Sequence, residues 1–185
     1  VLDTNLAGVS ALELKRLRQR CQLVFQNANP LDGLTAIDNV ALPLRKKFSL
    51  PLAEAQERAL LALKSVWAED VAWEMPQRLG TGLRKRVAIA RALALHPEVI
   101  LYDEPTTGLD PQTARRLDDL IIDISERLCV TSVIVSHDRL SLKRVAQSVS
   151  FIEAGQVRFH GAATELRHSS ESAIAEFFGG RDARD

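Results

Sequence analysis

Continuous apolar runs alternate with amphipathic stretches along this chain, and the two patterns predict strands and helices in turn. A short apolar run between turn-forming residues is typical of a buried strand, whereas apolar residues at helical spacing indicate a helix packed on one side. The predicted strands cover residues 1–3, 22–26, 98–102, 131–135, 149–153 and 156–160. The predicted helices cover residues 11–18, 52–66, 82–95, 111–127 and 140–146, with another starting at 35–38 and two more near the C-terminus. Buried strands separated by helices favour a parallel α/β core.

Local signals indicate where three of these helices begin or break. Ser10 and Glu13 form a capping-box pattern at the start of the first helix. Asp110 is placed to cap the helix that Pro111 opens. Pro43 falls inside a predicted helix, and we expect it to interrupt or kink that helix because proline lacks the amide donor.

Composition narrows the class of protein. The 185 residues carry 24 basic and 24 acidic side chains, and this zero net charge indicates no nucleic-acid partner. No apolar stretch approaches the roughly 20 residues that a membrane helix needs, so we expect no direct membrane insertion. Cys21 and Cys129 lie beside apolar runs, and we interpret them as buried free thiols in a reducing, cytoplasmic compartment.

Two adjacent carboxylates, Asp103 and Glu104, follow the apolar strand at 98–102. Burying such a pair costs free energy unless a cation or a proton-transfer role compensates. The arrangement suits a magnesium-nucleotide hydrolase, in which the first acid holds the metal and the second deprotonates the attacking water. The alternative is a simple strand end followed by a capped helix.

Polar residues also follow two other predicted strands. Gln26 follows the strand at 22–26, and His137 lies just after the strand at 131–135. Ligands gather at the carboxyl ends of parallel strands, so neighbouring strands would bring these side chains to the acidic pair. Taken singly, Gln26 is a strand terminator, His137 a core or loop histidine, and the basic residues of the 82–95 helix a solvated face.

The ordered set of motifs resembles the ATPase subunit of an ABC transporter. The motifs are Gln26, Leu79-Gly80-Thr81-Gly82-Leu83-Arg84-Lys85-Arg86, Asp103-Glu104, Gly108-Leu109-Asp110 and Ser136-His137-Asp138. The resemblance implies an α/β fold of the P-loop NTPase (RecA-like) type with a parallel-sheet core. Residues 34–95 would form an inserted helical subdomain, and residues 1–33 and 96–185 would form the nucleotide-facing core and the C-terminal part.

The resemblance also implies roles for single residues, with ATP and Mg²⁺ as cofactors. Asp103 would hold Mg²⁺, and Gln26 would contact Mg²⁺ and the attacking water. Glu104 would be the general base, and His137 would contact the γ-phosphate. Asp110 would lie at the interface with a second ATPase subunit. The loop after Gln26 would meet a membrane permease subunit, so the protein would lie on the cytoplasmic face of the membrane.

The signature segment, Leu79-Gly80-Thr81-Gly82, departs from the family's usual Leu-Ser-Gly-Gly. In the family this segment and the following helix N-terminus face the ATP held by the opposite subunit. Here the serine hydroxyl is absent at Gly80. Thr81 would be strained if its backbone required a positive φ, and its own hydroxyl is a candidate replacement.

No Gly-x-x-x-x-Gly-Lys-[Ser/Thr] phosphate loop occurs in these residues, and neither does the aromatic residue that stacks on adenine in the family. We interpret the chain as truncated at its N-terminus, and we expect the isolated chain to bind ATP poorly. A degenerate, non-hydrolysing partner subunit is the alternative.

Several stretches resemble the phospholipid-transporting (Mla or Mkl-type) ATPases within this family. They are residues 84–95, 101–111, 155–161 and 177–180. The sequence therefore favours phospholipid transport between bacterial envelope membranes. The alternative is an ATPase of another importer or exporter, such as one for amino acids or peptides.

Overall fold

The computed structural model describes residues 2–28 and 30–165. The chain divides into two compact units, Val1–Ser136 and His137–Asp185, and each is described by itself. The two predicted C-terminal helices lie outside the described residues. The predicted strand at the N-terminus is wrong, because Leu2 and Asp3 form a turn with φ of 48° and 59°.

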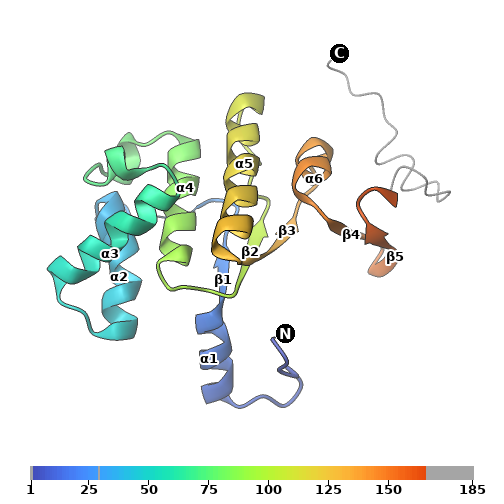
Figure 1. Ribbon diagram of the computed structural model, residues 1–185, viewed down its shortest axis with the longest axis horizontal. Helices are drawn as coiled ribbons and strands as arrows, with labels where there is room; N and C mark the ends of the chain where they lie inside the picture. Colours follow the sequence, from blue (N-terminus) through green and yellow to red (C-terminus); the bar gives the residue numbers. More distant parts are fainter. Residues whose placement is uncertain (1, 29, 166–185) are drawn as a thin grey trace. The chain divides into compact units, whose positions relative to one another are not determined.

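A three-stranded parallel sheet forms the centre of the first unit (Figure 1). Its strands are β1 (Cys21–Val24), β2 (Val99–Asp103) and β3 (Thr131–Val135), in the order β1-β2-β3. The parallel α/β core expected from the sequence is therefore confirmed. The register sets Val24 opposite Tyr102, and Tyr102 opposite Ile134.

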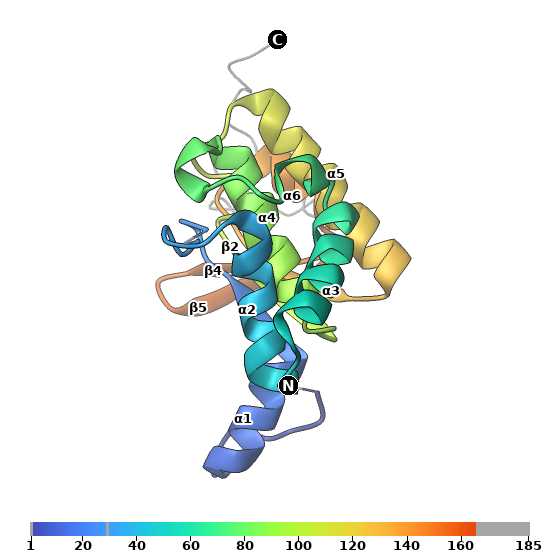
Figure 2. The same ribbon diagram turned by 90° about the vertical axis from the view of Figure 1, so that its left-hand side faces the viewer.

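Helices pack on one another and on one face of this sheet (Figure 2). The packed helices are α2 (Ala36–Phe48), α3 (Leu52–Ser65), α4 (Thr81–Leu93) and α5 (Pro111–Leu128), with short 3₁₀ turns at Glu69–Val71 and Pro76–Arg78, while α1 (Ala11–Arg20) precedes β1 and is mainly exposed. Val24, Ile100 and Tyr102 share the core with α4 and α5 side chains such as Ile89 and Leu120. Burial of this shared apolar surface is the main force that joins the helices to the sheet.

The capping signals are confirmed, and the helix interruption considered for Pro43 does not occur. The Ser10 hydroxyl accepts from the Glu13 amide while the Glu13 carboxylate accepts from the Ser10 amide, which completes the capping box of α1. Asp110 accepts from the first amides of α5. Pro43 lies inside α2, which continues to Phe48. The packing of α2 on α3 and α4 offsets the one helix hydrogen bond that Pro43 cannot donate.

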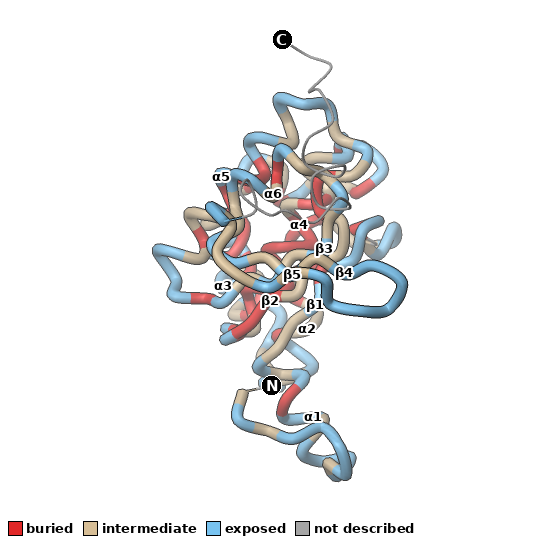
Figure 3. The backbone as a smooth tube through the Cα atoms, turned by 90° about the vertical axis from the view of Figure 1, so that its right-hand side faces the viewer, coloured by how far each residue is buried: buried red, intermediate tan, exposed pale blue. Residues whose placement is uncertain are grey.

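The opposite face of the sheet is more exposed than the sequence predicts. Leu23, Val133 and Val135 are 46%, 47% and 63% exposed, because α4 and α5 pack on the other face. Figure 3 shows the buried residues gathered inside the first unit and α1 mainly exposed. The two cysteines are free, but neither is fully buried: Cys21 is half-buried and Cys129 is exposed.

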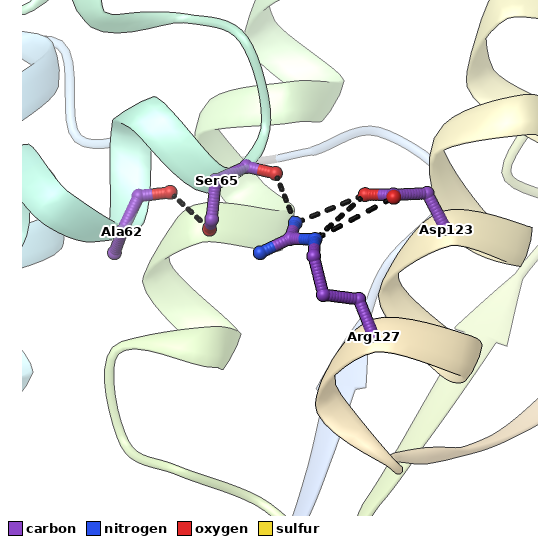
Figure 4. A network of polar contacts seen from close by, with 4 residues as sticks. All are labelled: Ala62, Ser65, Asp123 and Arg127. Atoms are coloured by element: carbon purple, nitrogen blue, oxygen red, sulfur yellow. Dashed lines mark hydrogen bonds and ion pairs between the residues drawn. The ribbon is translucent and has the colours of Figure 1, made fainter.

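Arg127 joins the end of α5 to the end of α3 (Figure 4). Its guanidinium donates to the Ser65 carbonyl at 3.1 Å and to the Asp123 carboxylate at 2.9 Å. A cation at a helix C-terminus satisfies a free carbonyl and complements the helix dipole. This contact links the helical segment to the helix that covers the sheet.

The second unit contains α6 (Arg139–Val145) and an antiparallel hairpin of β4 (Ser148–Glu153) and β5 (Gln156–Ala162). Ala154 and Gly155 form its turn with φ of 49° and 75°, the left-handed pair that matches hairpin twist. No helix within residues 2–28 and 30–165 is long and apolar enough to cross a membrane.

Candidate functional site

The ends of the first unit's strands bring most of the predicted residues to one edge of the sheet. Val24 on β1 is opposite Tyr102 on β2, and Gln26 and Glu104 each lie two residues beyond that pair. Ser136 directly follows β3. The predicted convergence therefore holds for the residues that belong to this unit.

Glu104 occupies a left-handed turn with φ of 46°, which is uncommon for a residue with a side chain. Its amide donates to the Val135 carbonyl at 2.9 Å. Its carboxylate accepts from the Thr107 hydroxyl at 3.0 Å and from the Ser136 hydroxyl at 3.5 Å. The surrounding turn and two hydroxyls thus fix the direction of a half-buried carboxylate, as a general base requires.

Asp103 is the last residue of β2, opposite Val135, and is half-buried. Within the described residues, no group of three His, Cys, Asp or Glu side chains could hold a metal ion by itself. Mg²⁺ is often bound through one or two carboxylates together with substrate phosphates. The Asp103 carboxylate and the side-chain amide oxygen of Gln26 are oxygen donors of the kind that Mg²⁺ binds, and their role as its ligands stays a prediction.

Lys85 of α4 lies beneath the two loops that carry Gln26 and Glu104. Its side chain is 3% exposed, and its ammonium donates to the Gln26 carbonyl at 3.0 Å and to the Glu104 carbonyl at 3.4 Å. Burial lowers the pKa of Lys85, and the Glu104 carboxylate opposes that change. One buried cation thus contacts the main chain at the ends of both β1 and β2.

The basic side of α4 is not the solvated face that the sequence suggests. Besides Lys85, Arg86 donates to the Trp67 carbonyl at 3.2 Å, and Arg91 donates to the Ala28 carbonyl at 3.3 Å. Burial lowers the pKa of both guanidinium groups. These cations satisfy carbonyls of the loops around α4, which a helical pattern alone does not reveal.

The signature segment begins α4 without backbone strain. Gly80 is the N-cap with φ of −63°, and no side chain caps the helix there. Thr81 is the first helical residue and has no positive φ, so the steric cost considered for it does not arise. A Cβ on Gly82 would lie 2.6 Å from Thr113 Cγ2 of α5, so this position requires close approach. Leu79 is buried in front of the helix.

Asp110 and His137 are the two predicted site residues that remain to be described. Asp110 is exposed and caps α5, and its hydrogen bonds with Thr113 and Gln112 hold its pKa below the ordinary aspartate value. Its predicted capping role is therefore confirmed. His137 is exposed and is the first residue of the second unit, and its predicted role stays a prediction.

Sequence reasoning missed the side chains that hold the acidic turn. Thr107 and Ser136 donate to Glu104, and Lys85 supports its carbonyl. Thr107 lies near the acidic motif, and Ser136 directly follows β3. Because ligands gather at the carboxyl ends of parallel strands, hydroxyl residues at these places could have been chosen as candidates from the sequence. Lys85 gives no such signal, because its burial depends on tertiary packing.

The ABC transporter family model matches residues 3–107, which is more than half of the chain. The chain belongs to the ABC transporter family. It is 35% identical to the methionine import ATP-binding protein MetN of Desulfitobacterium hafniense over 94% of this chain and 51% of that protein. It is 37% identical to MetN of Ligilactobacillus salivarius over 95% of this chain and 50% of that protein. The chain therefore spans about half the length of these curated relatives.

Solved structures agree on the fold. The ATP-binding cassette MJ0796, a dimer in a post-hydrolysis state bound to ADP and Pi, has a TM-score of 0.76 and 32% identity, covering 88% of this chain and 72% of that one. CbiO1 of Clostridium perfringens, part of the transporter complex CbiONQ, has a TM-score of 0.79 and 28% identity, covering 86% of this chain and 63% of that one. The P-loop NTPase-like fold is therefore confirmed.

The same comparisons correct the expected cargo. These sequence relatives are named as methionine importers, whereas the sequence stretches favoured phospholipid transport. ATPase cores are alike across cargoes because the cargo is not bound by the elements that hold nucleotide. The comparisons thus favour the amino-acid alternative.

Proposed function

We propose that this protein is the ATP-hydrolysing subunit of an ABC importer for an amino acid. The observation that supports it most is the fixed Glu104 carboxylate, held by Thr107 and Ser136 next to Asp103 at the end of β2. Membership of the family supplies the reaction class. A strand stop without a catalytic role would need no such positioning of an acidic side chain.

Each of the predicted residues would have a separate role in ATP hydrolysis. Bound Mg²⁺ would neutralise phosphate charge, and Asp103 with Gln26 would orient it. Glu104 would take a proton from the attacking water, its carboxylate already aimed by two hydroxyl donors. His137 would stabilise charge on the γ-phosphate oxygens.

The signature segment and Asp110 are proposed to face a second ATPase subunit. The first turn of α4 presents amides that no side chain caps at Gly80, and such amides attract a phosphate. Leu79 packs in the core in front of this turn, while Thr81 and Gly82 form it. The ATP of the second subunit would bind there.

Residues 34–95 are proposed as the helical subdomain that transmits motion to a membrane permease. α2, α3 and α4 pack on one another within this range. The Gln26 loop, residues 25–35, joins β1 to α2 and would meet the permease on the cytoplasmic face of the membrane. Residues 1–33 and 96–185 are proposed as the nucleotide-facing core and the C-terminal part.

Methionine is the cargo to test first, because the relatives are named for methionine import. The native complex, purified through a tag on this subunit, should hydrolyse Mg-ATP faster in vesicles that contain L-methionine and its binding protein. Deletion of the gene should abolish uptake of labelled methionine. Stimulation by phospholipid instead would overturn the amino-acid assignment, and an absence of hydrolysis would overturn the ATPase assignment.

A further inference from the structure

We propose that Lys85 is a positioning residue that ties the Gln26 loop to the turn at Glu104, so that the loop and the base move together. The inference rests on the proposed function, because it concerns how the proposed general base, Glu104, is held in position. It concerns a side chain on α4 that binds no substrate itself. Its action passes through two main-chain carbonyls.

Because Lys85 is buried, its two hydrogen bonds have to replace the water that its ammonium group has lost. A lysine side chain that is 3% exposed loses most of its hydration, which is costly unless hydrogen bonds replace it. The ammonium has three donors, and two of them reach the Gln26 and Glu104 carbonyls at 3.0 and 3.4 Å. Removing the cation would leave both carbonyls without this donor in a buried place.

On the β2 side, the contact stabilises a strained turn. The Glu104 carbonyl accepts from both Lys85 and the Thr107 amide, the latter at 3.3 Å. The φ of 46° at Glu104 persists only where its surroundings hold it. The same turn aims the carboxylate at the Thr107 hydroxyl. Lys85 therefore sets the backbone that orients the base.

On the β1 side, the contact anchors the Gln26 loop to α4. The turn at Gln26 is closed by the Ala28 amide, which donates to the Phe25 carbonyl at 3.0 Å. Arg91 holds the Ala28 carbonyl from the same helix. A displacement of this loop would pull on Lys85 and, through it, on the Glu104 turn.

Amide hydrogen exchange in the nucleotide-free protein tests the tie without using ATPase activity. Ala28 and Thr107 carry the reporter amides, and the Ala114 amide of α5 is the reference. Lys85→Met should speed exchange at both reporters at least tenfold and leave the reference unchanged. Lys64→Met, at an exposed lysine of α3, is the matched control and should change neither. Lys85→Gln replaces Lys85→Met if the latter does not fold.

Hydrolysis by the native complex tests the consequence. Lys85→Met should lower kcat at least tenfold and leave KM for ATP within twofold. Lys85→Arg, which keeps charge and donors, should restore kcat to within threefold of the wild type. A purely structural role would lower kcat and raise KM together, with no recovery in Lys85→Arg.

The outcomes separate this proposal from the proposed function. If the Ala28 and Thr107 amides exchange as slowly in Lys85→Met as in the wild type, or if exchange becomes faster in only one of the two loops, then Lys85 does not link the loops. Faster exchange in both loops with unchanged kcat would overturn the positioning role. If the wild-type complex hydrolyses no ATP, the proposed function and the positioning role both fall, even where exchange shows the two loops tied.

Discussion

Gly82 and Thr113 lie so close that a Cβ on Gly82 would be 2.6 Å from Thr113 Cγ2. The first turn of α4 therefore packs directly on the first turn of α5. The Thr113 amide also donates to the carboxylate of Asp110, the cap of α5, at 3.0 Å. The signature segment and the Asp110 turn are thus in mechanical contact within one chain.

A double-mutant cycle measures this contact. Gly82→Ala should gain about 1 kcal/mol of helix propensity and lose about 1–3 kcal/mol to overpacking, for a net loss of stability. In a Thr113→Ser background the clashing methyl is gone while the hydroxyl remains, so the same change should stabilise the protein. Urea unfolding of the four proteins gives the coupling free energy, which we expect to exceed about 1 kcal/mol. Additive effects would show that α4 and α5 do not constrain each other here.

Substitutions at Gly80, the N-cap of α4, should change the free energy of unfolding in the order in which residues are preferred at helix N-caps. The cap at Gly80 has extended backbone geometry, and a Cβ there would meet nothing within 4 Å. Gly80→Ser should therefore raise the free energy of unfolding by a few tenths of a kcal/mol, roughly, while Gly80→Ala should lower it. Thermal unfolding of the three proteins tests the order serine, glycine, alanine. Alanine at or above serine would mean that the start of α4 differs from the one described.

The single tyrosine should tolerate loss of its hydroxyl. Tyr102 is 1% exposed, and among the described residues its Oη has no hydrogen-bond partner of standard geometry. Burial raises its pKa to about 12, and the neighbouring Ser132 opposes part of that rise. Tyr102→Phe should keep or increase stability by up to about 1 kcal/mol, because it removes an unsatisfied buried group.

Ultraviolet titration checks the same environment. The tyrosinate band should be absent at pH 10.0, where an ordinary tyrosine is half ionised. Half ionisation at that pH, or a loss of stability above about 1 kcal/mol in Tyr102→Phe, would show that Oη is hydrated or hydrogen-bonded.

The ion pair between Arg20 and Glu98 should make a small, pH-dependent contribution to stability. The Arg20 hydrogen bond lowers the pKa of Glu98 below its ordinary value of 4.5. A carboxylate with a lowered pKa in the folded state stabilises the protein above its ordinary pKa, and this stabilisation is lost as pH falls through the folded pKa. The stability difference between wild type and Glu98→Gln should therefore be positive at neutral pH and vanish in acid. Glu57→Gln, at an exposed glutamate of α3, should show no such trend.

Local sequence signals predicted the helix starts because adjacent residues determine them. Ser10 with Glu13, and Asp110 with Pro111, contain both the cap and its partner within one helical turn. The sequence predicted only that the polar residues at the strand ends would converge if those strands were neighbours, and the order β1-β2-β3 meets that condition. Pro43 shows the limit of this reasoning, since packing of α2 outweighed one missing donor.

Burial could not be predicted from the sequence in the same way. Lys85 belongs to a run of basic residues that is typical of a solvated face, yet it lies in the interior because two loops distant in sequence close over it. Val133 and Val135 belong to an apolar run that is typical of a buried strand, yet both are exposed. In each case the outcome depends on which elements pack around the residue.

The central claim is that Glu104 is the base of an ATPase, and Glu104→Gln tests it most directly. The substitution keeps the shape and the Thr107 contact and removes the proton acceptor. In the native complex it should lower kcat for Mg-ATP by about a hundredfold or more and leave ATP binding intact, whereas Glu126→Gln, at an exposed glutamate of α5, should have no effect. Wild-type turnover in Glu104→Gln would contradict the account.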